Sequence, residues 1–156
     1  MIYWYVAGIW LQLRGASSAI SRSIFLIGSL GALFLIVYAV ALGTTGDAFR
    51  LQRRIGIIVY FTFTYLAQLL MTWRLARAPN RPETFSILLG ICLFLLSVGI
   101  FTIILDLTIE NYEDYEDAFE WVLALAIHLY FLTTYWTWKE SGFHFVGAIK
   151  KGSEEP

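Results

Sequence analysis

A histidine lies in the middle of a long apolar run near the end of the chain. Residues 118–136 read AFEWVLALAIHLYFLTTYW, with His128 close to the centre. An imidazole can relay a proton, ligate a metal or hydrogen-bond a polar neighbour. Apolar surroundings disfavour its charged form, and the neutral ring still has one donor and one acceptor to satisfy. We therefore expect a neutral His128 that bonds a polar group on a neighbouring helix.

Four polar side chains recur at every fourth position of an earlier apolar run, namely Tyr60, Thr64, Gln68 and Thr72. Residues four apart lie on one face of a helix. In hydrocarbon, polar groups on such a face hydrogen-bond to neighbouring helices. We expect this face to make interhelical hydrogen bonds, with a polar cavity wall as the alternative. We also predict that Thr64 or Gln68 is the partner of His128.

The imidazole could instead be the axial ligand of a haem or a chlorophyll. A bis-histidine haem is excluded within this chain, because His144 lies too far along from His128 to share an iron. Cys92 is the only cysteine, which excludes an intrachain disulfide and a thiolate metal cluster. The sequence also lacks the short motifs of metalloproteases, serine hydrolases and phosphate-binding loops. We therefore expect no catalytic residue, no metal and no cofactor, with ligation of a pigment or haem by His128 as the less favoured alternative.

Acidic residues gather just before the last apolar run. The segment 106–120 reads DLTIENYEDYEDAFE, and its acidic residues include Glu113, Asp114, Glu116, Asp117 and Glu120. A calcium-binding loop needs a defined ligand order and usually a glycine for its turn, and this segment has neither. We expect a solvated acidic cap that repels anions or meets a basic partner.

The composition shows what surrounds these residues. The chain has 156 residues, of which 58% are hydrophobic and only 15% are charged. A soluble domain has about a quarter of its residues charged, so this chain has too little polar surface to cover a globule. The net charge is −1 and the basic residues are scattered. These features predict an integral membrane protein and argue against nucleic acid as a partner.

Four apolar runs have the length of a membrane-spanning helix, which is about 20 residues for a hydrocarbon core of about 30 Å. They cover residues 24–43, 55–73, 85–105 and 119–136. A further apolar segment, residues 2–13, would be only about 18 Å long as a helix. We expect it to lie at the membrane interface, or to be the tail of a helix that begins outside this chain. The predicted fold is an all-α, polytopic transmembrane helix bundle, a single membrane domain over residues 1–156 with four full spans plus a short N-terminal apolar helix.

The connections between these runs are short, which predicts antiparallel neighbours in an up-down bundle. Small residues at Gly28 and Ala32, and again at Ala39 and Gly43, predict close helix contacts. Orientation follows from the lysine and arginine residues, which favour the cytoplasmic side. One side has most of them, namely Arg14, Arg22, Arg74, Arg77, Arg81, Lys139, Lys150 and Lys151. The other side has Arg50, Arg53 and Arg54, so we expect a cytoplasmic tail at residues 139–156 and an acidic 106–120 loop outside or in a lumen.

Two stretches carry a resemblance to a known family. The segment FEWVLALAIHLYFLTTYW, through Glu120-Trp121 and through Tyr130-Phe131-Leu132-Thr133, is similar to the last transmembrane helix of the DRAM/Frag1/Sfk1 family of polytopic membrane proteins. The segment RLQRRIGIIVYFTFTYLAQLLMTWRL is similar to its fourth span. The resemblance covers approximately residues 20–138.

The chain departs from the family pattern in two ways. Family members usually have six spans and a long first lumenal loop, so this chain resembles a shortened form. The acidic residue near the end of the last helix is replaced by Thr137 or Trp138. The resemblance implies a cytoplasmic C-terminus and a role in autophagy and lysosomes, in lipid remodelling of GPI anchors or in lipid organisation. It transfers no catalytic residues.

The expected function is that of a non-enzymatic integral membrane protein that organises lipids or membrane partners. The expected partners are the lipid bilayer and other membrane protein chains. The alternative is a structural accessory subunit of a larger multi-subunit membrane complex, because the short first helix and the aromatic-rich faces suggest a bundle that another chain completes.

Overall fold

The computed structural model describes residues 1–78, 80–108 and 113–143, and for residues 113–116 it describes the backbone alone. Within these ranges the protein is all-α, as predicted. Its helices are α1 (Ile2–Leu13), α2 (Ser18–Ala41), α3 (Asp47–Ala76), α4 (Phe85–Thr108) and α5 (Glu113–Glu140). The last four are long and apolar enough to cross a membrane, which is compatible with an integral membrane protein.

The helices extend beyond the apolar runs that predict them. Helix α3 has 30 residues, about 45 Å of helix, although its apolar run covers only residues 55–73. Its first turn has Asp47 and its last turn has Arg74, and these charges complement the helix dipole at each end. Hydropathy identifies only the part of a helix that matches hydrocarbon, so charged ends that continue the helix are missed.

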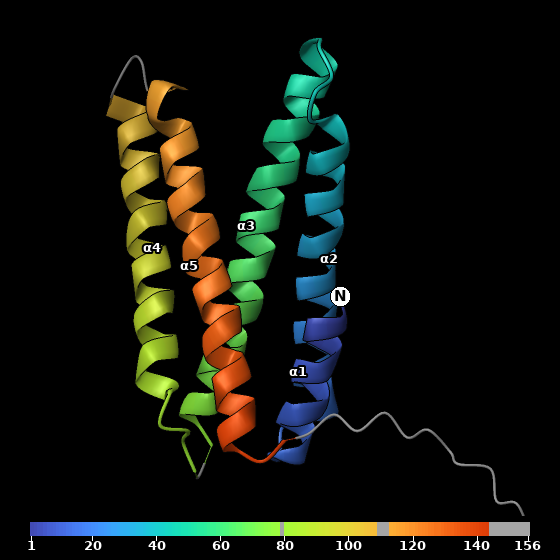
Figure 1. Ribbon diagram of the computed structural model, residues 1–156, viewed down its shortest axis with the longest axis vertical. Helices are drawn as coiled ribbons and strands as arrows, with labels where there is room; N and C mark the ends of the chain where they lie inside the picture. Colours follow the sequence, from blue (N-terminus) through green and yellow to red (C-terminus); the bar gives the residue numbers. More distant parts are fainter. Residues whose placement is uncertain (79, 109–112, 144–156) are drawn as a thin grey trace, which may run out of the picture.

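The four long helices run up and down in turn (Figure 1). The α2–α3 turn, the end of α4 and the start of α5 lie at one end of the bundle. The α1–α2 and α3–α4 connections and the end of α5 lie at the opposite end, here called the closed end. This alternation confirms the predicted up-down arrangement.

Helix α1 packs one side closely against the bundle. Its Trp4, Trp10 and Leu11 are each at most 3% exposed, and Ala7 is fully buried. The indole Nε1 of Trp10 donates a hydrogen bond to Ser141 beyond the end of α5, at 3.1 Å. One side of α1 therefore packs against α2 and α5, while Ile2, Tyr5 and Leu13 remain exposed. Whether this segment lies at the membrane interface or is the tail of a longer helix stays a prediction.

Glycine residues allow α2 to approach its neighbours. A Cβ atom on Gly28 would lie 2.3 Å from the ring of Trp4, and one on Gly31 would lie 2.9 Å from the hydroxyl of Thr64. The predicted close contact at Gly28 is thus confirmed. The one predicted at Ala39 and Gly43 is wrong, because Ala39 is exposed and Gly43 has nothing within 4 Å of a Cβ position. Gly43 has a φ of +80° and serves the turn after α2.

The core is concentrated toward the closed end. Its buried members come from every helix and include Trp10 of α1, Ile24 of α2, Met71 and Leu75 of α3, Leu88 and Cys92 of α4, and Tyr130 of α5. Toward the opposite end, the α2–α3 pair and the α4–α5 pair diverge in Figure 1. The packing therefore joins all helices at the closed end and leaves the two pairs separated at the other.

Candidate functional site

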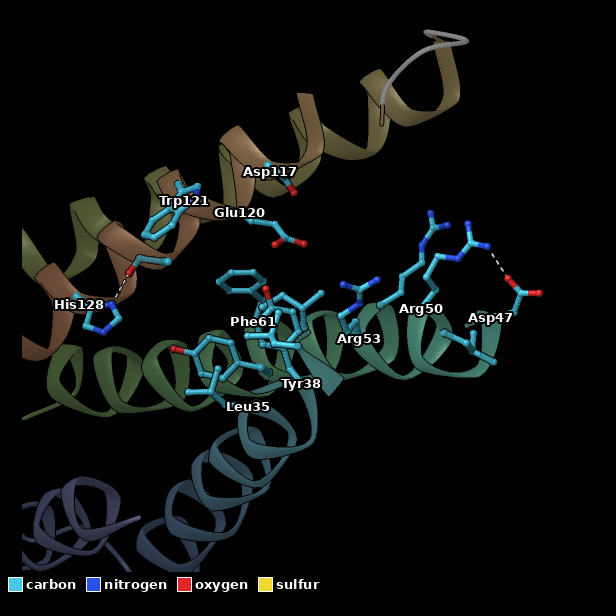
Figure 2. Close-up of a pocket in the computed structure, with 16 residues that line it drawn as sticks. Leu35, Tyr38, Asp47, Arg50, Arg53, Phe61, Asp117, Glu120, Trp121 and His128 are labelled. Carbon is cyan, nitrogen blue, oxygen red and sulfur yellow. Dashed lines mark hydrogen bonds and ion pairs between the residues drawn. The ribbon is translucent and has the colours of Figure 1, made fainter. Parts of the chain in front are cut away.

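The separation of the two helix pairs forms a recess of about 940 Å³ between α2, α3 and α5. Ligand pockets in proteins usually measure about 300–1,000 Å³, so the recess is large enough for a sizeable molecule. Figure 2 shows its lining side chains. They are Leu35, Tyr38 and Leu42 of α2 and its C-cap, Asp47, Arg50, Leu51, Arg53, Arg54, Ile57, Tyr60 and Phe61 of α3, and Asp117, Glu120, Trp121, Ala124 and His128 of α5.

The α3 wall of the recess is basic. Arg50, Arg53 and Arg54 are spaced so that a helix places them on neighbouring positions of one face. Arg50 forms an ion pair with Asp47 one turn earlier. Among the side chains that the structure describes, neither Arg53 nor Arg54 has an ion-pair partner. Two guanidinium groups are therefore available to a ligand at this wall.

The α5 wall opposite is acidic and aromatic. Asp117 and Glu120 are one turn apart at the start of the helix, and Trp121 follows directly. Figure 2 shows both carboxylates directed from α5 toward α3, with Arg53 extending from the other side. Charges of opposite sign thus line the same end of the recess from two helices.

The deeper part of the recess is apolar and aromatic. Leu35, Phe61 and Ala124 line it, and His128 lies at its far end along α5. His128 is two turns beyond Glu120, which corresponds to about 12 Å along the helix. The recess is therefore amphipathic along its length, with charged groups at one end and apolar side chains at the other.

Among the residues that the structure describes, His128 hydrogen-bonds to its own helix and to no neighbouring one. Its Nδ1 lies 2.7 Å from the carbonyl oxygen of Ala124. A carbonyl only accepts, so Nδ1 carries the hydrogen and, in the neutral ring, Nε2 is left as an acceptor. The predicted hydrogen bond to Thr64 or Gln68 is wrong, because the imidazole lies in the recess whereas those two side chains are buried in the helix interfaces.

The polar face of α3 has two roles. Gln68 donates from Nε2 to the carbonyl of Ile127 on α5 at 3.5 Å, and Thr72 lies 2.8 Å from the hydroxyl of Tyr130. Thr64 packs against Gly31 of α2. The predicted interhelical hydrogen bonds are confirmed for Gln68 and Thr72, whereas Tyr60, at the other end of this face, lines the recess.

The acidic residues expected in a 106–120 loop lie largely on helices. Asp106 belongs to α4, and α5 already begins at Glu113. Asp117 and Glu120 therefore lie in the recess wall, while the side chains of Glu113, Asp114 and Glu116 lie outside the described residues. Carboxylates are favoured near a helix N-terminus, which explains why an acidic segment continues as helix. The predicted cytoplasmic tail begins within α5, because that helix extends through residues 139–140. Residues 144–156 of the tail, which include His144, lie outside the described residues.

Sequence reasoning missed most of this site. From the sequence, the basic residues Arg50, Arg53 and Arg54 were used only to predict the orientation of the chain in the membrane. Their spacing could have marked a basic helix face, and Asp117 with Glu120 could have marked an acidic one on α5. Nothing in the sequence indicates that these two faces are opposed across an open space.

Comparison of the chain with protein family models, with curated proteins and with solved structures gives no match. The resemblance to the DRAM/Frag1/Sfk1 family therefore stays a prediction.

Proposed function

We propose that this chain is a non-enzymatic integral membrane protein that organises lipids by holding a membrane lipid in the recess between α3 and α5. The observation that carries the proposal is the polarity gradient of the recess. Arg53 and Glu120 lie at one end, and Phe61 and His128 lie farther along. A membrane lipid has the same sequence of a charged headgroup followed by apolar chains.

The depth of these residues supports a lipid occupant. The apolar run of α3 begins at Ile55, directly after Arg54, and that of α5 begins close to Glu120. The charged end of the recess therefore falls where a span meets the headgroup region, and His128 falls about 12 Å farther into the hydrocarbon. A lipid could enter this recess sideways with its headgroup and chains at their ordinary depths.

Binding without conversion of the lipid is part of the proposal. General acid and base groups must each reach the reacting atoms within about 3 Å. Glu120 and His128 lie on the same helix about 12 Å apart, which does not suit joint action on one bond. The recess is better suited to holding a molecule than to cleaving it.

A lipid that binds the folded protein raises the free energy of unfolding in proportion to the logarithm of its concentration. The test is the thermal melting of delipidated protein in mild detergent with increasing phospholipid. At ten times the dissociation constant, we expect about 1.4 kcal/mol of stabilisation. Ala124→Trp, which fills the recess, should abolish the shift, whereas Ala118→Trp, at an exposed position of α5 outside the recess, should retain it. A wild-type melting temperature that does not respond to any phospholipid would contradict the proposal.

The alternative function, an accessory subunit of a larger membrane complex, is favoured by a different observation. In the most apolar stretch of helix α4, only 17% of the residues are buried. A second, almost wholly apolar groove of about 580 Å³ lies between α4 and α5, and it includes Gly90, where a Cβ atom would meet nothing within 4 Å. Stoichiometric co-purification with another membrane chain in mild detergent would support this alternative, and a stable monomer would count against it.

A further inference from the structure

Resting on the proposed lipid binding, we infer that the recess selects a zwitterionic phospholipid, with the phosphate against the arginines of α3 and the headgroup nitrogen against the carboxylates of α5. Among the side chains that the structure describes, the charged lining groups are three arginines and three carboxylates, which sum to zero net charge. The charges are separated by helix, because the arginines are all on α3 and two of the carboxylates are on α5. The complement of such a lining is a ligand that is neutral overall and carries both signs.

The phosphate has its partners on α3. Arg53 is half-buried, Arg54 is exposed, and neither has an ion-pair partner among the described side chains. A guanidinium offers several N–H donors in a planar fork that matches a phosphate group. Arg50 is already paired with Asp47, so Arg53 and Arg54 are the principal phosphate ligands.

The headgroup nitrogen has its partners on α5. Asp117 and Glu120 direct their carboxylates across the recess toward α3 (Figure 2). A positively charged ammonium or choline group next to the phosphate would lie between them and Arg53. Trp121 and Phe61 also line the recess, and aromatic faces attract cations, quaternary ammonium included.

The same carboxylates disfavour a purely anionic lipid. A phosphatidylglycerol would bring a phosphate to Arg53 and Arg54 but no positive charge to the α5 wall, where the carboxylates of Asp117 and Glu120 would repel its net negative charge. A diacylglycerol would leave both walls without an ionic partner. Exposed ion pairs of this kind are worth about 0.2–1 kcal/mol, so each should change the preference by about 1.4- to fivefold.

The experiment is a competition read by native mass spectrometry of the full chain in mild detergent. The probes are palmitoyl-oleoyl phosphatidylethanolamine, phosphatidylcholine and phosphatidylglycerol at equal concentration, with the matching diacylglycerol as a neutral reference. We expect the ethanolamine or the choline lipid to occupy the protein about two- to fivefold more than phosphatidylglycerol, and the diacylglycerol least. Free phosphoethanolamine at the same concentration should not displace the bound lipid, because it cannot fill the apolar part of the recess.

Two variants assign the headgroup contacts. Asp117→Asn combined with Glu120→Gln should remove the preference over phosphatidylglycerol while some lipid remains bound. Arg53→Gln combined with Arg54→Gln should lower the occupancy of all three phospholipids. Matched controls are Asp106→Asn on α4 and Arg22→Gln on α2, which change charge outside the recess and should leave the preference unaltered.

The outcomes separate the inference from the function on which it rests. Equal or stronger binding of phosphatidylglycerol would overturn the zwitterionic selection and leave lipid binding intact. The same holds for a preference that persists in the Asp117→Asn, Glu120→Gln variant. Displacement by free phosphoethanolamine would overturn a lipid as the occupant, and the absence of any retained lipid would overturn both proposals.

Discussion

The hydroxyl of Tyr130 on α5 lies 2.8 Å from the hydroxyl of Thr72 on α3. The Tyr130 hydroxyl donates to the carbonyl of Gln68 at 2.9 Å, so the Thr72 hydroxyl is the donor to Tyr130. Both side chains are at most 2% exposed. This contact holds α3 and α5 together on the closed side of the recess, and the helices separate beyond it.

Replacing Tyr130 with phenylalanine tests this contact. Tyr130→Phe removes the shared hydroxyl and leaves the buried Thr72 hydroxyl without that acceptor. We expect a loss of about 1 kcal/mol, the usual size of a side-chain hydrogen bond in a membrane protein. The measurement is the midpoint of denaturant unfolding in mild detergent, with Tyr135→Phe as control, because Tyr135 is 57% exposed. Equal stability of the two variants would show that the bond contributes nothing.

Trp4 and Gly28 form a close contact between α1 and α2. A Cβ atom on Gly28 would lie 2.3 Å from the Trp4 ring, so Gly28→Ala forces the indole to move. Overpacking of this kind costs about 1–3 kcal/mol. Gly90→Ala is the control, because that position is open, and we expect no loss of stability there.

A double-mutant cycle separates this clash from a general effect on α2. Trp4→Ala removes the indole and should relieve the clash. The double variant Trp4→Ala, Gly28→Ala should therefore lose less free energy of unfolding than the sum of the two single losses. Additive losses would contradict the contact.

His128 lines the recess and bonds only a carbonyl of its own helix among the hydrogen bonds of the described residues. We therefore expect His128→Leu to change the free energy of unfolding by no more than about 0.5 kcal/mol. Unfolding in detergent measures this, and a loss above about 2 kcal/mol would show that the imidazole has a structural partner. The visible absorption spectrum of the wild type tests the alternative, in which His128 ligates a haem or a chlorophyll. A Soret or chlorophyll band that disappears in His128→Leu would establish such a pigment.

Orientation in the membrane can be tested with single cysteines. The proposed direction places the α2–α3 turn outside or in a lumen and the α3–α4 connection in the cytoplasm. The variants are made in a Cys92→Ala background and expressed in the inner membrane of a bacterium. A maleimide that reaches the periplasm but does not cross the inner membrane should label Thr45→Cys in intact cells and Asn80→Cys only after lysis. Labelling in the reverse order would invert the proposed topology.

The fold was largely predictable because its main determinant is local. Runs of about 20 apolar residues identify membrane helices, and short connections make neighbours antiparallel. The position of α1 was not predictable in this way. Its burial depends on Gly28 providing space for Trp4, and a contact between two particular side chains of different helices is not encoded in the hydropathy of either.

The site was predictable only in part, for the same reason. Gln68 and Thr72 were identified from their spacing, since a polar helix face in hydrocarbon must find partners. The partner of His128 was predicted wrongly, because sequence spacing gives the face on which a residue lies but not which helix it meets. Arg53 and Glu120 face each other across the recess because the two helix pairs diverge, which no local pattern predicts.

The central claim is that one phospholipid occupies the recess, and the number of lipids retained by the purified chain tests it most directly. Native mass spectrometry after exchange into mild detergent should show one phospholipid bound per wild-type chain. Ala124→Trp should retain none, while Ala118→Trp should retain one. A wild-type chain that retains no phospholipid, or an Ala124→Trp variant that retains as much as the wild type, would contradict the account.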